Sequence, residues 1–568
     1  MLVPLVAVLA VLDLALALAH VLRSVRPPTR LRPRQTLQSV EGSVASPNGT
    51  TFNSVIVPLT LSKDQQSYYT VIQAGNTSFR VALDTGSADL WLISSACATS
   101  ACSSVPKYQL AYQSPTFVSV NSNQTLFNAS FADGTDADGF VALETVQLSN
   151  LTVPNQALGL VTSTNVTVGD QVSGLLGLGF PRLSRIFNSG VVNATPFFAT
   201  MAQRGQLDYP LFGLSLTRNS SGTLALGAVD GSVVTNASLI DWNEVVPFAP
   251  FGSESNTTSY LQWTIPLSTI FVGNTSIAPQ PTYPNATSSS YSLALLDVGT
   301  SGIFGPYQDV SRIYSAIAGS RLVSDGQWAV PCDVNTTLSF QFNSQQKFVL
   351  QPTDFLIGPA SGDPNLCLSW PRALPPSSDG IDWQLGASFL RTVYSIFSLG
   401  IDAKEPPFVG LYPLRSPAST STPDPLSSIS AFFSSISGTI GTTLPNFPLP
   451  TPSTFSLPAY TFNTSSPIPH PTPGLIVSSG LATSTYVPVL GTHHMNVSAI
   501  PTLSPSPTLA TFLLTDAQGH VSTSVSTASL ASVTLGTPPG WTSGGVSLRS
   551  VIDLRVVGAV VLGLVAVW

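Results

Sequence analysis

Two apolar segments of this chain each run into an aspartate that is followed two residues later by glycine. The first reads VALDTGS and contains Asp84, and the second reads LALLDVGTS and contains Asp297, 213 residues further on. One such turn is weak evidence for a site, because aspartate is common in exposed turns. Each turn, however, is followed by a second apolar segment that contains glycine, GLLGLG at 174–179 and WQLGASFLR at 383–391. This duplication predicts two similar lobes that each bring one carboxylate to a shared cleft.

The region between residues 51 and 416 has the pattern of a β-rich domain. Short alternating apolar segments recur in it and are separated by Gly, Asn, Ser and Pro, which is typical of strands joined by turns. Only 196–204 and 307–317 suggest short helices. Because a region of this size seldom forms a single core, we expect an all-β fold with a few short helices. Its two lobes are predicted at 51–245 and 246–416.

The composition excludes several classes of function. Charged residues make up 9% of the chain and the formal net charge is −7, so the domain has no basic surface for nucleic acid. The region 51–416 contains no histidine, and a Ser-His or Cys-His nucleophile would therefore lack its base. A metal site lacks histidine ligands for the same reason, and the four cysteines are spaced for disulfides instead. We expect neither a metal nor another cofactor. The five histidines are His20, His470, His493, His494 and His520.

The N-terminal end has the pattern of a secretory leader. Residues 1–19 are apolar apart from Asp13 and close on Ala17-Leu18-Ala19, which predicts a signal peptide cleaved near His20. An uncleaved membrane anchor is the alternative. Residues 20–50 carry several arginines, and this basic leader is interpreted either as a propeptide held by charge or as a disordered arm.

The C-terminal part of the chain changes composition abruptly. Residues 417–545 are rich in Ser, Thr, Pro and Gly and contain no Lys or Arg, which predicts a disordered, O-glycosylated stalk. The tail 546–568 is a spacer followed by thirteen apolar residues, too short for the roughly 30 Å core of a bilayer. With the small residues that begin at Ser543, it matches a signal for attachment of a GPI anchor. A transmembrane helix is the alternative.

Several Asn-x-Ser/Thr sequons accompany the leader, and together they favour a glycosylated, secreted protein. The candidates for glycosylation are Asn76, Asn123, Asn150, Asn236, Asn285 and Asn335.

Residues 60–414 resemble the pepsin-like aspartic proteases, in particular secreted, GPI-anchored fungal members. The segment Asp84-Thr85-Gly86-Ser87 is similar to the first catalytic turn of that family, and Asp297-Val298-Gly299-Thr300-Ser301 to the second. The segment 131–139 is similar to the flap, the hairpin that covers the substrate. The resemblance assigns Phe131, Asp133, Gly134, Thr135 and Trp91 to the flap and substrate-binding region. It also implies the disulfides Cys97–Cys102 and Cys332–Cys367.

The resemblance implies a bilobal fold in which Asp84 and Asp297 meet at the base of the cleft. Two carboxylates about 4 Å apart repel by roughly 4 kcal/mol at an effective dielectric constant near 20, which separates their titrations by about 3 pH units. The pair then shares one proton over a wide acidic range. The ionised member activates a water and the protonated member polarises the peptide carbonyl. Ser87 and Thr300 are expected to donate hydrogen bonds to the outer carboxylate oxygens.

Three positions depart from the family pattern. Phe131 stands where the family usually has tyrosine and lacks the hydroxyl that would bond toward Trp91. Val298 replaces a threonine or serine whose hydroxyl forms half of a reciprocal brace between the two catalytic turns, a loss of about 1 kcal/mol. Ala387 replaces an aspartate that supports the lobe.

The sequence therefore predicts a secreted, monomeric aspartic endopeptidase attached to the cell surface or wall by a GPI anchor. It would cleave polypeptides between apolar residues at acidic pH. The alternative is a catalytically weakened relative that binds peptides or has a structural role in the wall.

Overall fold

The computed structural model describes the aspartyl-turn domain almost completely and parts of the C-terminal region. It describes residues 54–415 with short gaps, the longest at 249–259 and 284–290. Further along the chain it describes 424–436, then 481–505 with two gaps, the strands 509–515 and 521–527, and 534–539. The predicted leader, Ser543, the tail and Asn285 lie outside the described residues. Within the described part, no helix is long and apolar enough to cross a membrane.

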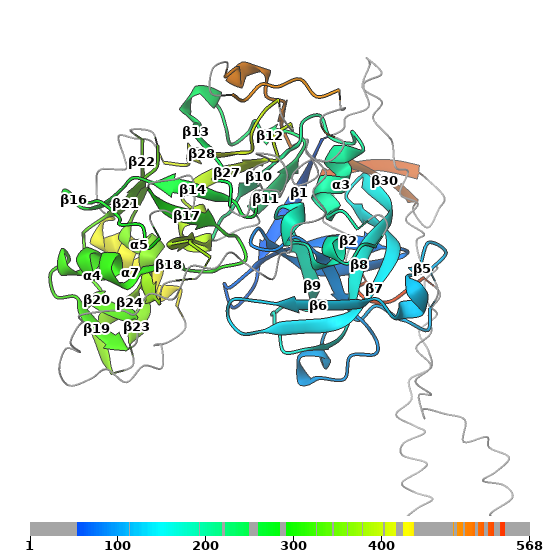
Figure 1. Ribbon diagram of the computed structural model, residues 1–568, viewed down its shortest axis with the longest axis horizontal. Coiled ribbons are helices and arrows are strands. Elements are labelled where there is room, and N and C mark those ends of the chain that lie inside the picture. The colour runs from blue at the N-terminus through cyan, green and yellow to red at the C-terminus, as the bar shows by residue number, and fades with distance from the viewer. Residues whose placement is uncertain are drawn as a thin grey trace, which may run out of the picture. The chain divides into compact units, whose positions relative to one another are not determined.

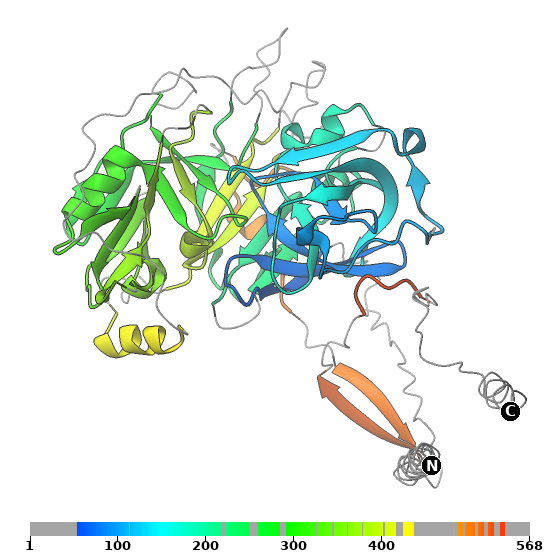
Figure 2. The same ribbon diagram turned by 90° about the horizontal axis from the view of Figure 1, so that it is seen from below.

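The domain consists of two β-rich lobes that lie side by side (Figures 1 and 2). The prediction of an all-β fold with few short helices is confirmed, and the two predicted helices are present as α3 and α4. The lobe boundary predicted at residue 245 falls between β13 and β14 and stays a prediction.

The elements of the first half of the domain are β1 (Val55–Leu61), β2 (Tyr68–Ala74), β3 (Thr77–Asp84), β4 (Leu90–Ile93), β5 (Val118–Ser119), β6 (Leu126–Ser130), β7 (Asp136–Leu148), β8 (Leu151–Thr164), β9 (Val172–Gly177), α2 (Arg185–Asn188), α3 (Phe197–Gln203), β10 (Leu211–Ser215), β11 (Gly222–Leu226), β12 (Val229–Asp230) and β13 (Asp241–Glu244). Short 3-10 turns lie at Ser100–Cys102, Asn121–Asn123, Pro181–Leu183 and Ala237–Leu239.

The elements of the second half are β14 (Thr264–Leu267), β15 (Thr269–Val272), β16 (Thr275–Ile277), β17 (Ser292–Leu296), β18 (Ile303–Pro306), α4 (Tyr307–Ser315), β19 (Arg321–Ser324), β20 (Gln327–Pro331), β21 (Leu338–Gln341), β22 (Lys347–Leu350), α5 (Pro352–Phe355), β23 (Leu356–Ala360), β24 (Asp363–Ser369), β25 (Arg372–Leu374), β26 (Trp383–Leu385), α6 (Ala387–Leu390), β27 (Val393–Ser398) and β28 (Phe408–Pro413). The C-terminal region adds α7 (Leu426–Ser434), a 3-10 turn at Val497–Ala499, β29 (Thr502–Leu503), and a hairpin of β30 (Leu509–Thr515) and β31 (Val521–Thr527) that belongs to a separate unit.

The two lobes repeat one arrangement of three strands. In the first lobe, β3 pairs in parallel with β9, and β9 pairs antiparallel with β4. In the second lobe, β17 pairs in parallel with β26, and β26 pairs antiparallel with β18. Since β3 ends at Asp84 and β17 ends one residue before Asp297, the repeat places both aspartates at the same structural position. The internal duplication read from the sequence is therefore present in the fold.

One sheet joins the two halves of the chain. Strand β10 of the first half pairs antiparallel with β27 of the second half, from Leu211 opposite Ser398 to Ser215 opposite Tyr394. The same sheet continues through β11 and β1 on one side and through β28 and β13 on the other. Backbone hydrogen bonds thus fix the lobes relative to each other below the aspartyl turns.

Buried aromatic side chains from both halves pack at this junction. The ring of Phe212 stacks on Phe397 at a centroid distance of 4.8 Å, and Trp263 lies 5.2 Å from Phe397 and 4.2 Å from Phe180. All four residues are fully buried. The indole Nε1 of Trp263 donates to the carbonyl of Leu178, 3.0 Å away, so that this buried indole is paired.

The predicted disordered stalk needs correction for α7, which begins ten residues after the domain. Ile429, Phe432 and Phe433 share one face of α7 because they are three and four residues apart, and Ile429 is buried against the domain. The Arg218 guanidinium lies 4.9 Å from the Phe432 ring, and the carboxylate of Asp424 accepts hydrogen bonds from the backbone and hydroxyl of Thr353. The helix is drawn in yellow in Figure 2.

Two further stretches of the predicted stalk, 485–491 and 495–505, also pack on the domain and together are called the strap here. Strand β29 of the strap pairs in parallel with β12. Tyr486 is buried, and its hydroxyl donates to the carbonyls of Ala202 and Leu207 at 3.1 Å. The composition averaged over the whole stalk does not reveal short segments that pack on the domain. A few buried apolar residues and paired backbone groups are enough to offset the ordering entropy of a short segment.

A buried carboxylate, Asp89, ties the segment after the first aspartyl turn to α2. Its Oδ1 accepts from the hydroxyl of Ser184, the N-cap residue of α2, and its Oδ2 accepts from the backbone of Arg185 at 2.7 Å. Burial raises the pKa of Asp89 to about 6, although these hydrogen bonds favour the ionised form. The folded protein therefore holds this proton more tightly than the unfolded chain does.

We predict that Asp89 makes the domain less stable as the pH rises from about 4 to 7. An acid with a raised folded-state pKa contributes stability that is complete below its unfolded value and is lost above its folded value. For Asp89 this loss is about 3 kcal/mol, so that Asp89→Asn should flatten the pH dependence of the free energy of unfolding in urea by that amount. The exposed Asp333 offers the control Asp333→Asn, which should keep the wild-type slope. An unchanged slope in Asp89→Asn would contradict the prediction.

Candidate active site

Asp84 lies at the end of β3 and is held by its own turn. Its Oδ1 accepts from the backbone of Gly86 at 2.8 Å, and its Oδ2 accepts from the Ser87 hydroxyl at 2.5 Å. The Asp84 carbonyl accepts from the backbone of Leu178, just after β9. The side chain is buried, with 7% of the residue exposed.

Asp297 follows β17 and is held in the same way. Its Oδ1 accepts from the backbone of Gly299 at 2.9 Å, and its Oδ2 accepts from the Thr300 hydroxyl at 2.7 Å. The residue is 5% exposed. The hydrogen bonds expected from Ser87 and Thr300 to the outer carboxylate oxygens are therefore both present.

The two carboxylates meet at one point between the turns. A methyl group added at Gly299 would lie 2.5 Å from Asp84 Oδ1 and 3.2 Å from Asp297 Oδ1. A methyl group added at Gly86 would lie 3.1 Å from Asp297 Oδ2. Each glycine therefore lies against the carboxylate of the opposite lobe, and any side chain at either position would push the two acids apart.

This contact changes the protonation of Asp84. Burial and then the neighbouring charge of Asp297 raise the pKa of Asp84 to about 7, while hydrogen bonds from Ser87 and Gly86 act in the opposite direction. Two touching carboxylates away from water cannot both be ionised without strong repulsion. The pair therefore retains a single proton over the acidic range, as the titration of two coupled acids requires.

Thr85 joins the two turns across the lobes. Its fully buried hydroxyl donates to the Leu296 carbonyl and accepts from the Val298 backbone, both at 2.9 Å. Val298 is also fully buried and has no hydroxyl to return such a bond. The brace therefore exists in one direction, as expected from the sequence. Ser301 supports the next element, because its carbonyl accepts from the backbone and hydroxyl of Ser388 in α6.

The predicted flap is a hairpin between β6 and β7. The backbone of Phe131 donates to the Thr135 carbonyl, and that of Gly134 donates to the Phe131 carbonyl. Gly134 has a φ of 83°, which only glycine adopts easily. Asp133 closes the turn by accepting from the backbone and hydroxyl of Thr135 at 2.9 and 2.7 Å.

Trp91 lies under the flap with an unpaired indole nitrogen. Phe131 is partly buried and packs against the apolar cluster that contains Trp91. Trp91 is 3% exposed, and its Nε1 has no hydrogen-bond partner among the described residues. Because Phe131 has no hydroxyl, it cannot accept a hydrogen bond from the buried Nε1 of Trp91, as a tyrosine could. A buried donor without a partner costs about 1–3 kcal/mol of stability.

Gln384, on β26, is a site residue that was not predicted from the sequence. Its Nε2 donates to Asp297 Oδ2 at 2.9 Å and to the Thr300 hydroxyl at 2.8 Å. The available signal was a polar residue between the apolar Trp383 and Leu385 in the segment that pairs with the second turn. A strand that alternates in this way is usually interpreted as having one solvated face, and that interpretation gives the amide no role in the site.

Both predicted disulfides are confirmed, as Cys97–Cys102 and Cys332–Cys367. No group of three or more His, Cys, Asp or Glu side chains in the described part of the chain is arranged to hold a metal ion.

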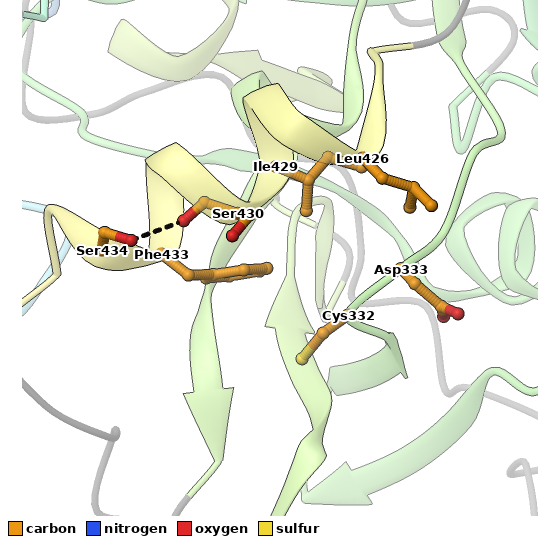
Figure 3. Close-up of a pocket in the computed structure, with 7 residues that line it drawn as sticks. All are labelled: Cys332, Asp333, Leu426, Ile429, Ser430, Phe433 and Ser434. Carbon is orange, nitrogen blue, oxygen red and sulfur yellow. Dashed lines mark hydrogen bonds between the residues drawn. The ribbon is translucent and has the colours of Figure 1, made fainter.

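A surface hollow of about 500 Å³ lies between α7 and the Cys332 disulfide (Figure 3). It is lined by Cys332, Asp333, Leu426, Ile429, Ser430, Phe433 and Ser434. The lining includes neither Asp84 nor Asp297 and no residue of the flap, so this hollow is separate from the site at the aspartyl turns.

Comparisons with known proteins identify the family of this chain. The family of eukaryotic aspartyl proteases matches residues 67–404. Major aspartyl peptidase 1 of Cryptococcus neoformans is 31% identical over 331 residues, 56% of this chain and 63% of that protein. An aspartic protease of Phaffia rhodozyma is 30% identical over 338 residues, 58% of this chain and 73% of that protein. Mouse cathepsin E is 28% identical over 361 residues, 61% of this chain and 81% of that protein.

The chain thus spans less than two thirds of the length of the Cryptococcus peptidase, but the family match extends over more than half of the chain itself. That match includes both aspartyl turns and the flap, and it agrees with the repeated strand arrangement that brings the turns together. The chain belongs to the eukaryotic aspartyl protease family.

Proposed function

We propose that the protein is an aspartic endopeptidase that hydrolyses peptide bonds through a water activated by Asp84 and Asp297. The observation that carries this proposal is the contact of two buried carboxylates, each held by a backbone amide and a hydroxyl of its own turn. No cofactor is required. The substrates are polypeptides, and the preference for apolar residues beside the cleaved bond rests on the family resemblance.

In this mechanism the ionised carboxylate takes a proton from a water that attacks the carbonyl carbon of the peptide. The protonated carboxylate donates its proton to the carbonyl oxygen, which gives a tetrahedral diol without a covalent bond to the enzyme. When the carbon–nitrogen bond breaks, the leaving amine takes the proton that the first carboxylate received from water. A hydroxyl of the diol gives its proton to the other carboxylate as the carboxylic acid product forms, and the pair is again singly protonated. Thr85 keeps the two turns in register during this exchange, since its hydroxyl bonds both sides of the second turn.

The proposed activity is confined to acidic and near-neutral pH. Because the pKa of Asp84 is raised to about 7, a rise in pH through about 7 removes the shared proton and with it the general acid. At strongly acidic pH a second proton binds to the pair and the general base is lost. The rate should therefore fall on both sides of an acidic optimum.

A catalytically weakened peptide-binding or wall-structural protein is the second candidate. Two observations favour it, the unpaired Nε1 of Trp91 under the flap and the one-directional brace at Val298. Neither affects the two aspartates themselves, and the endopeptidase remains the proposal.

We further propose a secreted, glycosylated monomer that is held at the cell surface or wall by a GPI anchor. Exposed sequons at Asn76, Asn123, Asn150, Asn236 and Asn335 support glycosylation, and the two disulfides fit an oxidising compartment. The proposal takes residues 1–19 as a signal peptide, 20–50 as a propeptide, Ser543 as the attachment site and 546–568 as the removed tail.

The endopeptidase activity is testable with the full-length secreted protein and denatured haemoglobin at pH 3 to 5. We expect cleavage that pepstatin abolishes, and Asp84→Asn should lower it by at least about 10²–10⁴-fold, the usual contribution of a general acid or base. The control variant Asp333→Asn changes an exposed acid outside the aspartyl turns and the flap, and it should cleave haemoglobin like the wild type. A folded wild-type protein without pepstatin-sensitive cleavage would favour the second candidate.

Phe131→Tyr is predicted to give Trp91 Nε1 a hydrogen-bond acceptor and to hold the flap more firmly. A hydrogen bond of about 1 kcal/mol corresponds to roughly a fivefold increase in kcat/KM, measured on a fluorogenic peptide. The same change in a Trp91→Phe background should bring no increase, which makes the double-mutant cycle specific for this pair. An equal increase in both backgrounds would show that the hydroxyl acts elsewhere.

Release by a phosphatidylinositol-specific phospholipase tests the anchor. We expect cells that express the full chain to release the protein into the medium after treatment, because the lipid is then its only hold on the membrane. A chain that ends before Ser543 should be secreted without treatment. Retention of the full chain after treatment would instead indicate a hydrophobic span in the tail.

A further inference from the structure

The two aspartates of the pair receive unequal numbers of hydrogen bonds at their outer oxygens. Asp84 Oδ2 accepts from the Ser87 hydroxyl at 2.5 Å. Asp297 Oδ2 accepts from the Thr300 hydroxyl at 2.7 Å and in addition from Gln384 Nε2 at 2.9 Å. The second lobe thus supplies one side-chain donor more than the first.

The fold shows that this difference is built into the repeated strands. In the first lobe, Leu175 of β9 pairs with Ala82, two residues before Asp84. In the second lobe, Gln384 of β26 pairs with Leu295, two residues before Asp297. Leu175 and Gln384 are therefore counterparts, and both are partly buried. Leucine has no donor, and so the extra hydrogen bond exists in one lobe alone.

The chemistry of the amide fixes the direction of this network. The NH₂ group of glutamine has two donors, and in Gln384 they reach Asp297 Oδ2 and the Thr300 oxygen. The opposite orientation would place the amide oxygen against a carboxylate oxygen, which is repulsive. Because the Thr300 oxygen accepts from Gln384, its single proton is free to donate to Asp297. Gln384 therefore supports Asp297 both directly and through Thr300.

We propose that Gln384 is a positioning residue that breaks the symmetry of the pair, keeping the negative charge on Asp297 and the shared proton on Asp84. Donors to a carboxylate favour its ionised form, and a neutral amide keeps donating at every pH. In the first step of the reaction Asp297 then acts as the general base and Asp84 as the general acid. This inference rests on the proposed endopeptidase function and assigns the two roles within it.

The charged groups near the pair do not oppose the placement of the proton on Asp84. Asp84 is the titratable group that touches Asp297, and burial together with the charge of Asp297 raises the pKa of Asp84, in agreement with a proton on Asp84. The carboxylate of Asp382, two residues before Gln384, accepts hydrogen bonds from Thr282, Ser292 and Leu293. Arg372 lies exposed on β25, the strand beyond β18.

The test compares the full-length wild type with Gln384→Met, which keeps the length of the side chain and removes the donors. Loss of the donors should move the acidic limb of the kcat/KM profile up by about one pH unit. The neutral limb should move less, since Asp297 is ionised on both sides of that step. The counterpart variant Leu175→Met should leave both limbs at their wild-type pH, whatever its rate. Coincident limbs in Gln384→Met and the wild type would overturn the inference and leave the proposed function standing.

A second measurement does not depend on turnover. In Asp84→Asn the second acid titrates without its partner, and infrared difference spectra follow its carboxyl band with pH. Adding Gln384→Met to Asp84→Asn should raise the midpoint of that titration by about one pH unit, and an unchanged midpoint overturns the inference. A raised midpoint in a protein whose wild type does not cleave would support the role of Gln384 and refute the endopeptidase. Thermal unfolding of each variant verifies that it is folded.

Discussion

The contact between Asp84 and Asp297 is the constraint on which the rest of the site depends. Two carboxylates that meet away from water repel each other unless they share a proton, and the fold must hold them together against that repulsion. It does so by giving each acid a backbone donor and a hydroxyl donor from its own turn, and by placing glycine where a side chain of the opposite turn would intrude. This contact lowers the stability of the fold at neutral pH, but it also creates a pair in which one carboxyl can donate a proton while the other accepts one.

The junction of the lobes explains how this contact is maintained. A sheet that pairs β10 with β27 and an aromatic cluster around Trp263 join the halves below the turns, while Thr85 joins them at the level of the carboxylates. The backbone pairing of β10 with β27 fixes the orientation of the lobes, and the aromatic cluster fixes the distance between them. The Thr85 hydroxyl fixes the position of one aspartyl turn relative to the other. A small rotation of one lobe would therefore break hydrogen bonds at Thr85 before it could separate the acids.

Much of this architecture was predictable because it follows from local sequence patterns. The duplicated apolar-Asp-x-Gly turns led to two lobes and to Asp84 and Asp297, and the resemblance to the pepsin-like family implied both disulfides. Gln384 was not predicted, since its role depends on a strand register that joins segments 87 residues apart. The docked strap was missed for a related reason. The carboxylate of Glu405 accepts from the backbone of Val489 and Leu490, a partnership that composition alone does not reveal.

The departures from the family pattern take on a common meaning once Gln384 is included. Val298 removes a hydroxyl from the brace, and among the described residues the brace then consists of the two hydrogen bonds of the Thr85 hydroxyl. On its other side, the second turn gains the amide of Gln384, which connects β26 to both Asp297 and Thr300. The turn is thus held by its own lobe more than by the opposite one. Because a hydrogen bond from the same lobe moves with the turn, it keeps Asp297 oriented in the same way at the start of each catalytic cycle, and the asymmetry of the resting pair is restored after each turnover.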